Sequence, residues 1–198
     1  SSCFVATKQD DYALITGASA GLGAEFARQL AAAGRNLILV ARREDRLSRL
    51  AEELRAAHTI DCQLIVADLN EPGAGAQISN TCMSSGWQVS WLVNNAGVAG
   101  PDLLKDRDWA AQQTFFQLMM LSVADLCHRM IPGMAERGYG RVVNVASVAA
   151  RVPRSGGCNY GPAKAYLVAL SEELNLTVAA QGVHVSALCP GFTHTDFH

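Results

Sequence analysis

The sequence predicts a single α/β domain built on a doubly wound parallel sheet. Short apolar runs alternate along the chain with longer stretches that carry apolar residues at helical spacing. The short runs are nearly continuous in apolar residues, which is typical of strands that are covered on both faces. Regular alternation of this kind implies parallel pairing through right-handed crossovers. No linker or repeat divides the chain, so we expect residues 1–198 to form one domain.

The expected elements follow one another without long gaps. The strands should cover residues 12–16, 36–41, 62–67, 89–93, 141–146 and 183–188. The helices should cover residues 22–33, 44–57, 73–85, 109–131 and 160–181. The first helix is rich in good helix formers, and the last tolerates Pro162 in its first turn, where a missing amide hydrogen costs little. Residues 151–159 contain proline and glycine breakers and are expected to be a loop.

A glycine-rich turn, residues 16–23, joins the first strand to the first helix. Amide groups at a helix N-terminus point at bound anions, and glycines let the backbone approach a phosphate closely. The glycine spacing differs from G-x-G-x-x-G, and there is no Gly-Lys-Ser/Thr as in a P-loop. The turn indicates a phosphate cradle, and a plain strand–helix connection is the alternative.

Tyr160 and Lys164 are four residues apart, so their side chains share one face of the last helix. An ammonium group beside a phenol favours the phenolate, which makes the pair a candidate general acid/base. Ser147 follows the apolar run 142–146 and should stand at the carboxyl end of a strand, where ligands bind in open α/β sheets. The trio suits proton transfer to or from a carbonyl or alcohol oxygen.

Arg42 and Arg43 follow the second strand, about 20 residues after the glycine turn. An NAD-binding site usually has an acidic residue there, which holds the ribose hydroxyls. Two guanidinium groups match a 2′-phosphate instead, through charge-assisted bidentate hydrogen bonds. The alternative is a solvated pair at the start of a helix, where cations are slightly unfavourable. The sequence therefore favours NADP(H) over NAD(H).

These features together resemble the short-chain dehydrogenase/reductase superfamily, in its NADP-preferring branch. Residues 16–23 look like the family's TGxxxGxG cofactor loop, residues 94–97 match its NNAG element, and residues 190–195 resemble its PGxxxT loop. Asp68 and Leu69 resemble the pair that contacts adenine. The resemblance covers most of the chain, and its motifs occur in the family's order.

The resemblance implies roles for individual residues. The catalytic set would be Ser147, Tyr160 and Lys164. The cofactor would be contacted by Gly17, Ser19, Gly21, Leu22, Gly23, Arg42, Arg43, Asp68, Leu69, Asn95, Ala96, Gly97, Tyr160, Lys164, Pro190, Gly191, Thr193 and Thr195.

The resemblance also implies a Rossmann-like sheet with the strand order 3-2-1-4-5-6. Family members usually continue for roughly a third as much again beyond the point where this chain stops, at His198. We therefore expect the C-terminal substrate loop and the seventh strand to be absent from this chain.

Met119 is a departure from the family pattern. It falls where the family usually has a catalytic asparagine, which is thought to hold a water that links the lysine to solvent. A thioether is a weak acceptor and donates nothing, so the proton relay would have to change. The alternative is that Met119 is simply a core residue of an apolar helix.

Composition argues against several other classes of protein. A net charge of −2 leaves no basic stripe for a nucleic acid, and no apolar run approaches the ~18 residues that would span a membrane. Residues 1–11 do not read as a secretion signal, so we expect a cytoplasmic protein. The cysteines are scattered without Cys-x-x-Cys, so we expect no metal site.

We interpret the chain as an NADP(H)-dependent oxidoreductase that interconverts a carbonyl and an alcohol on a small molecule. Two alternatives stay open: an NADP(H)-binding sensor or interaction module with low turnover, favoured by Met119, and a nucleotide-sugar epimerase. The epimerase would need a longer chain and a different glycine spacing. By resemblance, the helices at 109–131 and 160–181 pack against a second subunit, which implies a homodimer or homotetramer.

Overall fold

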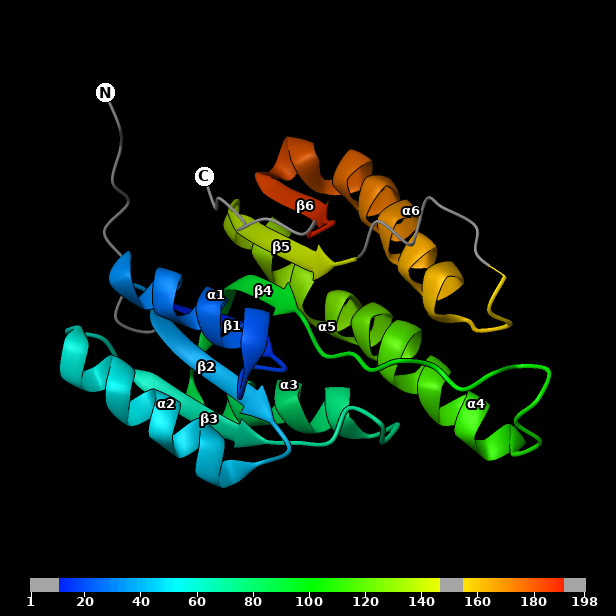
Figure 1. Ribbon diagram of the computed structural model, residues 1–198. Helices are drawn as coiled ribbons and strands as arrows, with labels where there is room; N and C mark the ends of the chain where they lie inside the picture. Colours follow the sequence, from blue (N-terminus) through cyan, green and yellow to red (C-terminus); the bar gives the residue numbers. More distant parts are fainter. Residues whose placement is uncertain (1–10, 147–154, 191–198) are drawn as a thin grey trace.

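The computed structural model describes residues 11–146 and 155–190 and contains one six-stranded sheet (Figure 1). The strands are β1 (Asp11–Thr16), β2 (Asn36–Ala41), β3 (Cys62–Val66), β4 (Gln88–Asn94), β5 (Gly140–Val145) and β6 (Val183–Leu188). Every neighbouring pair is parallel, and the spatial order is β3-β2-β1-β4-β5-β6. This confirms the predicted fold class and strand order.

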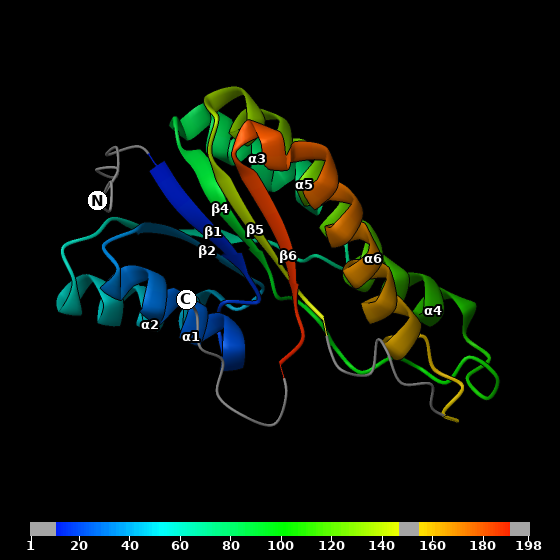
Figure 2. The same ribbon diagram turned by 90° about the horizontal axis from the view of Figure 1, so that it is seen from above.

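Helices cover both faces of the sheet (Figure 2). They are α1 (Gly21–Ala32), α2 (Glu44–Ala57), α3 (Ala74–Ser85), α4 (Trp109–Phe116), α5 (Ser122–Arg137) and α6 (Tyr160–Val178). The first two lie on one face, and the other four lie on the opposite face. In the described part of the chain, no helix combines the length and apolar composition needed to cross a membrane.

The side chains of β1 point alternately to the two faces of the sheet, and the core forms one layer on each face. Tyr12 and Leu14 pack with side chains of α3, α5 and α6, whereas Ala13 and Ile15 pack with those of α1 and α2. Successive side chains of a strand point to opposite faces, so a continuous apolar run serves both layers. This is the physical basis of the apolar strand pattern in the sequence.

The helix predicted at 109–131 is wrong in two respects. Residues Gln117–Leu121 form a π-helical turn (η1) between α4 and α5, and α5 continues through Pro132 to Arg137. Ile131 and Met134 flank the proline and are buried, so tertiary packing outweighs the hydrogen bond that the proline removes. The helix ends at Gly138, which adopts the left-handed conformation favoured at C-caps. The last helix is also shorter than predicted, because a 3₁₀ turn (η3, Ala179–Gln181) follows α6.

A buried polar network joins the central strands to α6. Asn94 of β4 donates from Nδ2 to Asn144 Oδ1 at 2.9 Å, and Asn144 of β5 donates from its own Nδ2 to Ser171 Oγ at 3.0 Å. Ser171 in turn donates to the Leu167 carbonyl oxygen at 2.6 Å. All three polar side chains are buried, so losing one leaves a buried donor or acceptor of its partner without that hydrogen bond.

We predict that Asn144→Leu lowers the free energy of unfolding by about 3 kcal/mol, because it leaves buried donors and acceptors of Asn94 and Ser171 unpaired. The matched control is Asn80→Leu on the exposed face of α3, which should change stability by less than about 0.5 kcal/mol. Urea unfolding monitored by circular dichroism measures both. Equal stabilities for the two variants would contradict a structural role for the network.

Candidate active site

The glycine turn after β1 packs directly against the loop that follows β4. Gly17 has a φ of +58°, and a Cβ on it would lie 3.1 Å from the Ala96 amide nitrogen. A Cβ on Gly23 would lie 2.1 Å from the Gly17 carbonyl oxygen and 2.6 Å from Asn95 Nδ2. Side chains are therefore excluded at both positions. A left-handed φ at Gly17 and the backbone contact at Gly23 fix the shape of the turn.

The buried hydroxyl of Thr16, at the start of the glycine turn, forms hydrogen bonds to the loop after β4. The Thr16 Oγ1 accepts from the amide of Asn95 at 3.0 Å and from that of Ala96 at 3.3 Å, and it donates to the Val93 carbonyl oxygen. Asn95 Nδ2 also donates to the Gly17 carbonyl oxygen at 3.3 Å. The NNAG segment recognised in the sequence thus lies beside the glycine turn.

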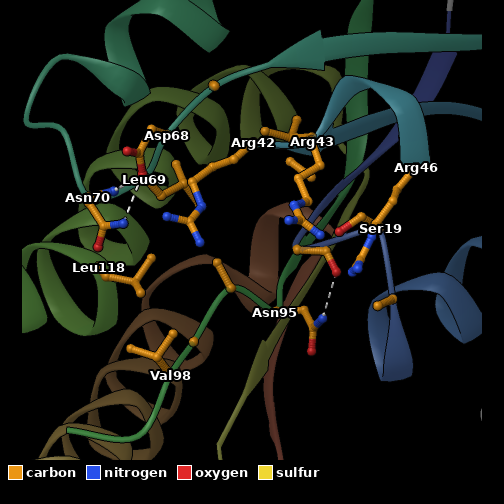
Figure 3. Close-up of a pocket in the computed structure, with 17 residues that line it drawn as sticks. Ser19, Arg42, Arg43, Arg46, Asp68, Leu69, Asn70, Asn95, Val98 and Leu118 are labelled. Atoms are coloured by element: carbon orange, nitrogen blue, oxygen red, sulfur yellow. Dashed lines mark hydrogen bonds between the residues drawn. The ribbon is translucent and has the colours of Figure 1, made fainter. Parts of the chain in front are cut away.

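A cavity of about 420 Å³ opens at this junction, at the carboxyl ends of β1, β2 and β3 (Figure 3). Its walls come from the glycine turn, the start of α2, the residues after β3 and the loop after β4. The charged side chains that line it are Arg42, Arg43, Arg46 and Asp68. The three guanidinium groups extend toward the same cavity (Figure 3). The volume and the excess of cations suit an anionic ligand of nucleotide size.

Asp68 shapes the wall opposite the glycine turn. Its Oδ1 accepts from the backbone amide of Asn70 at 3.0 Å and from Asn70 Nδ2 at 2.9 Å. This local turn follows β3 and holds the carboxylate at the cavity (Figure 3). Leu69 also lines the cavity, although its side chain is 6% exposed.

A second cavity, of about 510 Å³, continues the first one toward α6. The two share Asn95, Gly97 and Val98, so they form one cleft along the carboxyl edge of the sheet. The far end of this cleft is lined by Cys158, Tyr160, Lys164 and Pro190, together with Val145 and Ala146 of the β5 end.

Lys164 is buried at the floor of the second cavity. It is 6% exposed and donates from Nζ to the Val145 carbonyl oxygen at 2.9 Å. Its Nζ lies 5.7 Å from the centroid of the Tyr160 ring, within reach of a cation–π interaction. Burial lowers the pKa of Lys164 to about 8, because a low-dielectric environment disfavours the ammonium form. The phenol and the amine predicted to act together therefore lie in the same cavity.

Met119 occupies the space next to this lysine. A Cβ on Gly97 would lie 3.4 Å from Met119 Sδ and 3.6 Å from Lys164 Nζ, so the three residues converge on one point. Met119 is 1% exposed and sits in the π-helical turn between α4 and α5. Turns of this type occur often at functional sites. The methionine is thus both a core residue and a neighbour of the candidate catalytic pair.

The structure places most of the predicted site residues along the cleft. The first cavity is lined by Gly17, Ser19, Arg42, Arg43, Asp68, Leu69, Asn95, Ala96 and Gly97. The second is lined by Asn95, Gly97, Tyr160, Lys164 and Pro190. Ser147, Gly191, Thr193 and Thr195 lie outside the described residues.

Three predicted contacts, Gly21, Leu22 and Gly23, line neither cavity. They form the first turn of α1. Leu22 packs against the core beneath α1 and α2, and Gly23 serves the backbone contact with Gly17. Gly21 has a φ of +58° with open space around it, which leaves the backbone of the turn accessible.

Some lining residues were missed by sequence reasoning. Arg46, Asn70, Val98 and Leu118 line the first cavity. Arg46 carried a usable signal, because it is three residues after Arg43 and so lies on the same side of a helix. No comparable pattern marked Val98 or Leu118. Among described residues, no group of three or more His, Cys, Asp or Glu side chains is placed to hold a metal ion.

Comparison with known proteins supports the reading of the cleft. The family described as short chain dehydrogenase matches residues 11–198. The chain is 35% identical to sulfoacetaldehyde reductase 2 of Chromohalobacter salexigens, over 94% of this chain and 74% of that protein.

Two solved structures share the fold. A short-chain dehydrogenase from Sphingobium yanoikuyae in complex with NADPH gives a TM-score of 0.85 at 32% identity, over 91% of this chain and 70% of that one. The bulky-bulky ketone specific alcohol dehydrogenase from Comamonas testosteroni gives a TM-score of 0.84 at 32% identity, over 90% of this chain and 72% of that one. The family match and these relatives show that the chain belongs to the short-chain dehydrogenase/reductase family of NAD(P)-dependent oxidoreductases.

Proposed function

We propose that this chain is an NADP(H)-dependent oxidoreductase that interconverts a carbonyl and an alcohol, with Tyr160 as the general acid/base. The observation that carries the proposal is the position of Lys164 Nζ, 5.7 Å from the Tyr160 ring, in a cavity continuous with the arginine-lined one. The relatives named above include a reductase and an alcohol dehydrogenase, and one neighbour holds NADPH.

The residues of the cleft fit NADP(H) along its length. Arg42 and Arg43 would hold the 2′-phosphate, and Asp68 and Leu69 the adenine side. The glycine turn would approach the diphosphate, because Gly21 has open space around it and leaves the backbone of the turn accessible. We further propose that the nicotinamide side is bounded by Pro190, together with Gly191, Thr193 and Thr195 beyond the described residues.

Chemistry at the far end of the cleft then follows from the side chains there. A nicotinamide held in this cleft would supply the hydride for the carbonyl carbon. Tyr160 donates a proton to the carbonyl oxygen, and in the oxidising direction it removes that proton from the alcohol. Lys164 places a positive charge beside the Tyr160 ring and would hold the nicotinamide ribose. Ser147 would orient the carbonyl oxygen by a hydrogen bond.

Exposed apolar side chains support the proposal of a homodimer or homotetramer. Leu121 of η1 is 54% exposed, Leu176 of α6 is 85% exposed and Trp109 of α4 is 58% exposed. These helices lie on the same face of the sheet. Leu126 of α5 and Leu167 of α6, in contrast, are buried in the core and are not available to a partner.

We predict that Tyr160→Phe lowers kcat on a panel of ketones, aldehydes and 3-oxoacyl thioesters by about 10²- to 10⁴-fold, because it removes the proton donor and keeps the ring. The dissociation constant for NADPH, measured by fluorescence titration, should change little. Tyr166→Phe, on the same helix and outside both cavities, is the control and should keep its activity. NADPH binding with no turnover by the wild type, unaffected by Tyr160→Phe, would point to the low-turnover binding module instead.

We predict that kcat/KM for the carbonyl substrate falls as the pH rises through about 8, because this ratio reports the enzyme before the carbonyl binds and Lys164 loses its proton there. The ammonium form is present below that pH and is the form that assists Tyr160. A steady-state pH profile with saturating NADPH and limiting carbonyl substrate checks this. A constant kcat/KM up to pH 10 would contradict the role given to the ammonium.

The lowered pKa of Lys164 should also make the free energy of unfolding depend on pH. Between about pH 8 and the usual lysine value of 10.5, the unfolded chain keeps the proton that folded Lys164 has lost. The unfolded state then binds more protons, so the free energy of unfolding rises with pH across this window. Relative to Lys164→Met, the wild type should gain up to about 3 kcal/mol between these pH values, at about 1.4 kcal/mol per unit. Chemical denaturation at several pH values measures the difference.

We predict that Met119→Asn raises kcat by up to about tenfold, because an amide beside Lys164 both donates to and accepts from water, whereas a thioether only accepts weakly. Burying the amide should lower the free energy of unfolding by about 1–3 kcal/mol. Met119→Leu is the control, since it keeps the site apolar and should leave kcat low. Equal kcat values for the Asn and Leu variants would show that this position does not limit proton transfer.

A further inference from the structure

Arg46 is a third guanidinium group at the cavity that also contains Arg42 and Arg43. It lies in the first turn of α2, three residues after Arg43, which is the N-cap residue of that helix. Residues at this spacing lie on one side of a helix. Glu44 and Asp45, which separate the two arginines, do not line the cavity. The start of α2 therefore turns Arg43 and Arg46 toward the cleft and its two carboxylates elsewhere.

Neither helix stability nor ion pairing accounts for this arrangement. A cation in the first turn of a helix is unfavourable, because the N-terminal end of the helix dipole is positive. Three like charges within five residues also repel one another. The ion pairs within the described residues involve Arg28 and Arg129 instead. Glu44 and Asp45 of the same turn offset part of this cost, and a local arrangement that still costs stability is expected mainly at functional sites.

The positions of the three groups suggest how they share a ligand. Arg42 lies nearest to Asp68 and Leu69, and Arg46 lies nearest to Ser19 of the glycine turn, with Arg43 between them (Figure 3). A phosphate monoester carries a charge of about −1.5 to −2 and three terminal acceptor oxygens. It can therefore accept hydrogen bonds from guanidinium groups that approach from three directions.

We propose that Arg46 is a specificity-determining residue that binds the 2′-phosphate of NADP(H) together with Arg42 and Arg43. This inference rests on the proposed function, because it assigns a further ligand within the same cofactor site. Arg46 closes the phosphate site on the side of the glycine turn, whereas Arg42 closes it on the adenine side. The third cation strengthens the preference for the phosphorylated dinucleotide over NAD(H).

The test compares two nucleotides that differ only in the 2′-phosphate: adenosine 2′,5′-bisphosphate and 5′-AMP. Each is titrated by calorimetry into the full chain as wild type, Arg46→Ala and Arg49→Ala. Arg49 is an exposed arginine of the same helix that does not line the cavity, so its variant controls for net charge. We expect Arg46→Ala to weaken the affinity for the bisphosphate about tenfold, with little effect on the affinity for 5′-AMP. Arg49→Ala should leave the affinity for both nucleotides unchanged.

A charge reversal separates binding from folding. Arg46→Glu places a carboxylate in the first turn of α2, which the helix dipole favours. Its melting temperature should therefore not fall, while the affinity for the bisphosphate should fall further than in Arg46→Ala. The difference between Arg46→Ala and wild type should also shrink at high ionic strength, because the groups are exposed.

Each other outcome overturns the assignment. If Arg46→Ala loses affinity equally for both nucleotides, Arg46 binds the 5′-phosphate instead. If its affinity for the bisphosphate is unchanged, Arg46 does not belong to the phosphate site. If the wild type binds NADPH tightly and Arg46→Ala does the same, this inference fails while the proposed function stands. If the wild type binds neither NADPH nor the bisphosphate, both fail together.

Discussion

The cleft depends on the contact between the loops that follow β1 and β4. A single buried hydroxyl, that of Thr16, accepts the amides of Asn95 and Ala96, and the bare α-carbon of Gly23 lets the Gly17 carbonyl approach. β1 and β4 are neighbours in the sheet, and the chain order reverses between them. Ligands bind outside the carboxyl ends of the strands at such a reversal. The hydrogen bonds of Thr16 fix the width of the opening there.

The other half of the cleft is fixed by contacts of α6 with the central strands. Asn144 and Ser171 join this helix to β5 and β4 through side chains, and Lys164 joins it to β5 through the Val145 carbonyl oxygen. Tyr160 is the first residue of α6 and depends on these anchors for its position. Buried hydrogen bonds of this kind are costly to leave unmade, so they hold the helix in one register. Tyr160 and Lys164 thus stand on a helix rather than on a loop.

The sequence predicted the fold well because buried parallel strands leave an unambiguous pattern. Apolar runs separated by amphipathic stretches marked all the strands, and the ends of those runs marked the cleft, since parallel strands present their carboxyl ends on one edge. Tyr160 and Lys164 could be paired from helical spacing alone.

Features that depend on tertiary packing could not be predicted in the same way. The π-helical turn at Gln117–Leu121 shifts hydrogen bonds by one residue and leaves no compositional mark. The passage of α5 through Pro132 depends on how Ile131 and Met134 fit the core. Leu22 belongs to a cofactor-like motif, yet its side chain packs beneath α1 and α2, which only the three-dimensional arrangement reveals.

Burial of Lys164 gives the protein a reactive nucleophile as well as a partner for Tyr160. With a pKa of about 8, roughly one molecule in ten carries the uncharged amine at neutral pH, against fewer than about one in a thousand for an ordinary lysine. Desolvated amines of this kind form Schiff bases with carbonyl compounds. An aldehyde held in the cleft would thus meet a competing electron-pair donor in the same cavity as Tyr160.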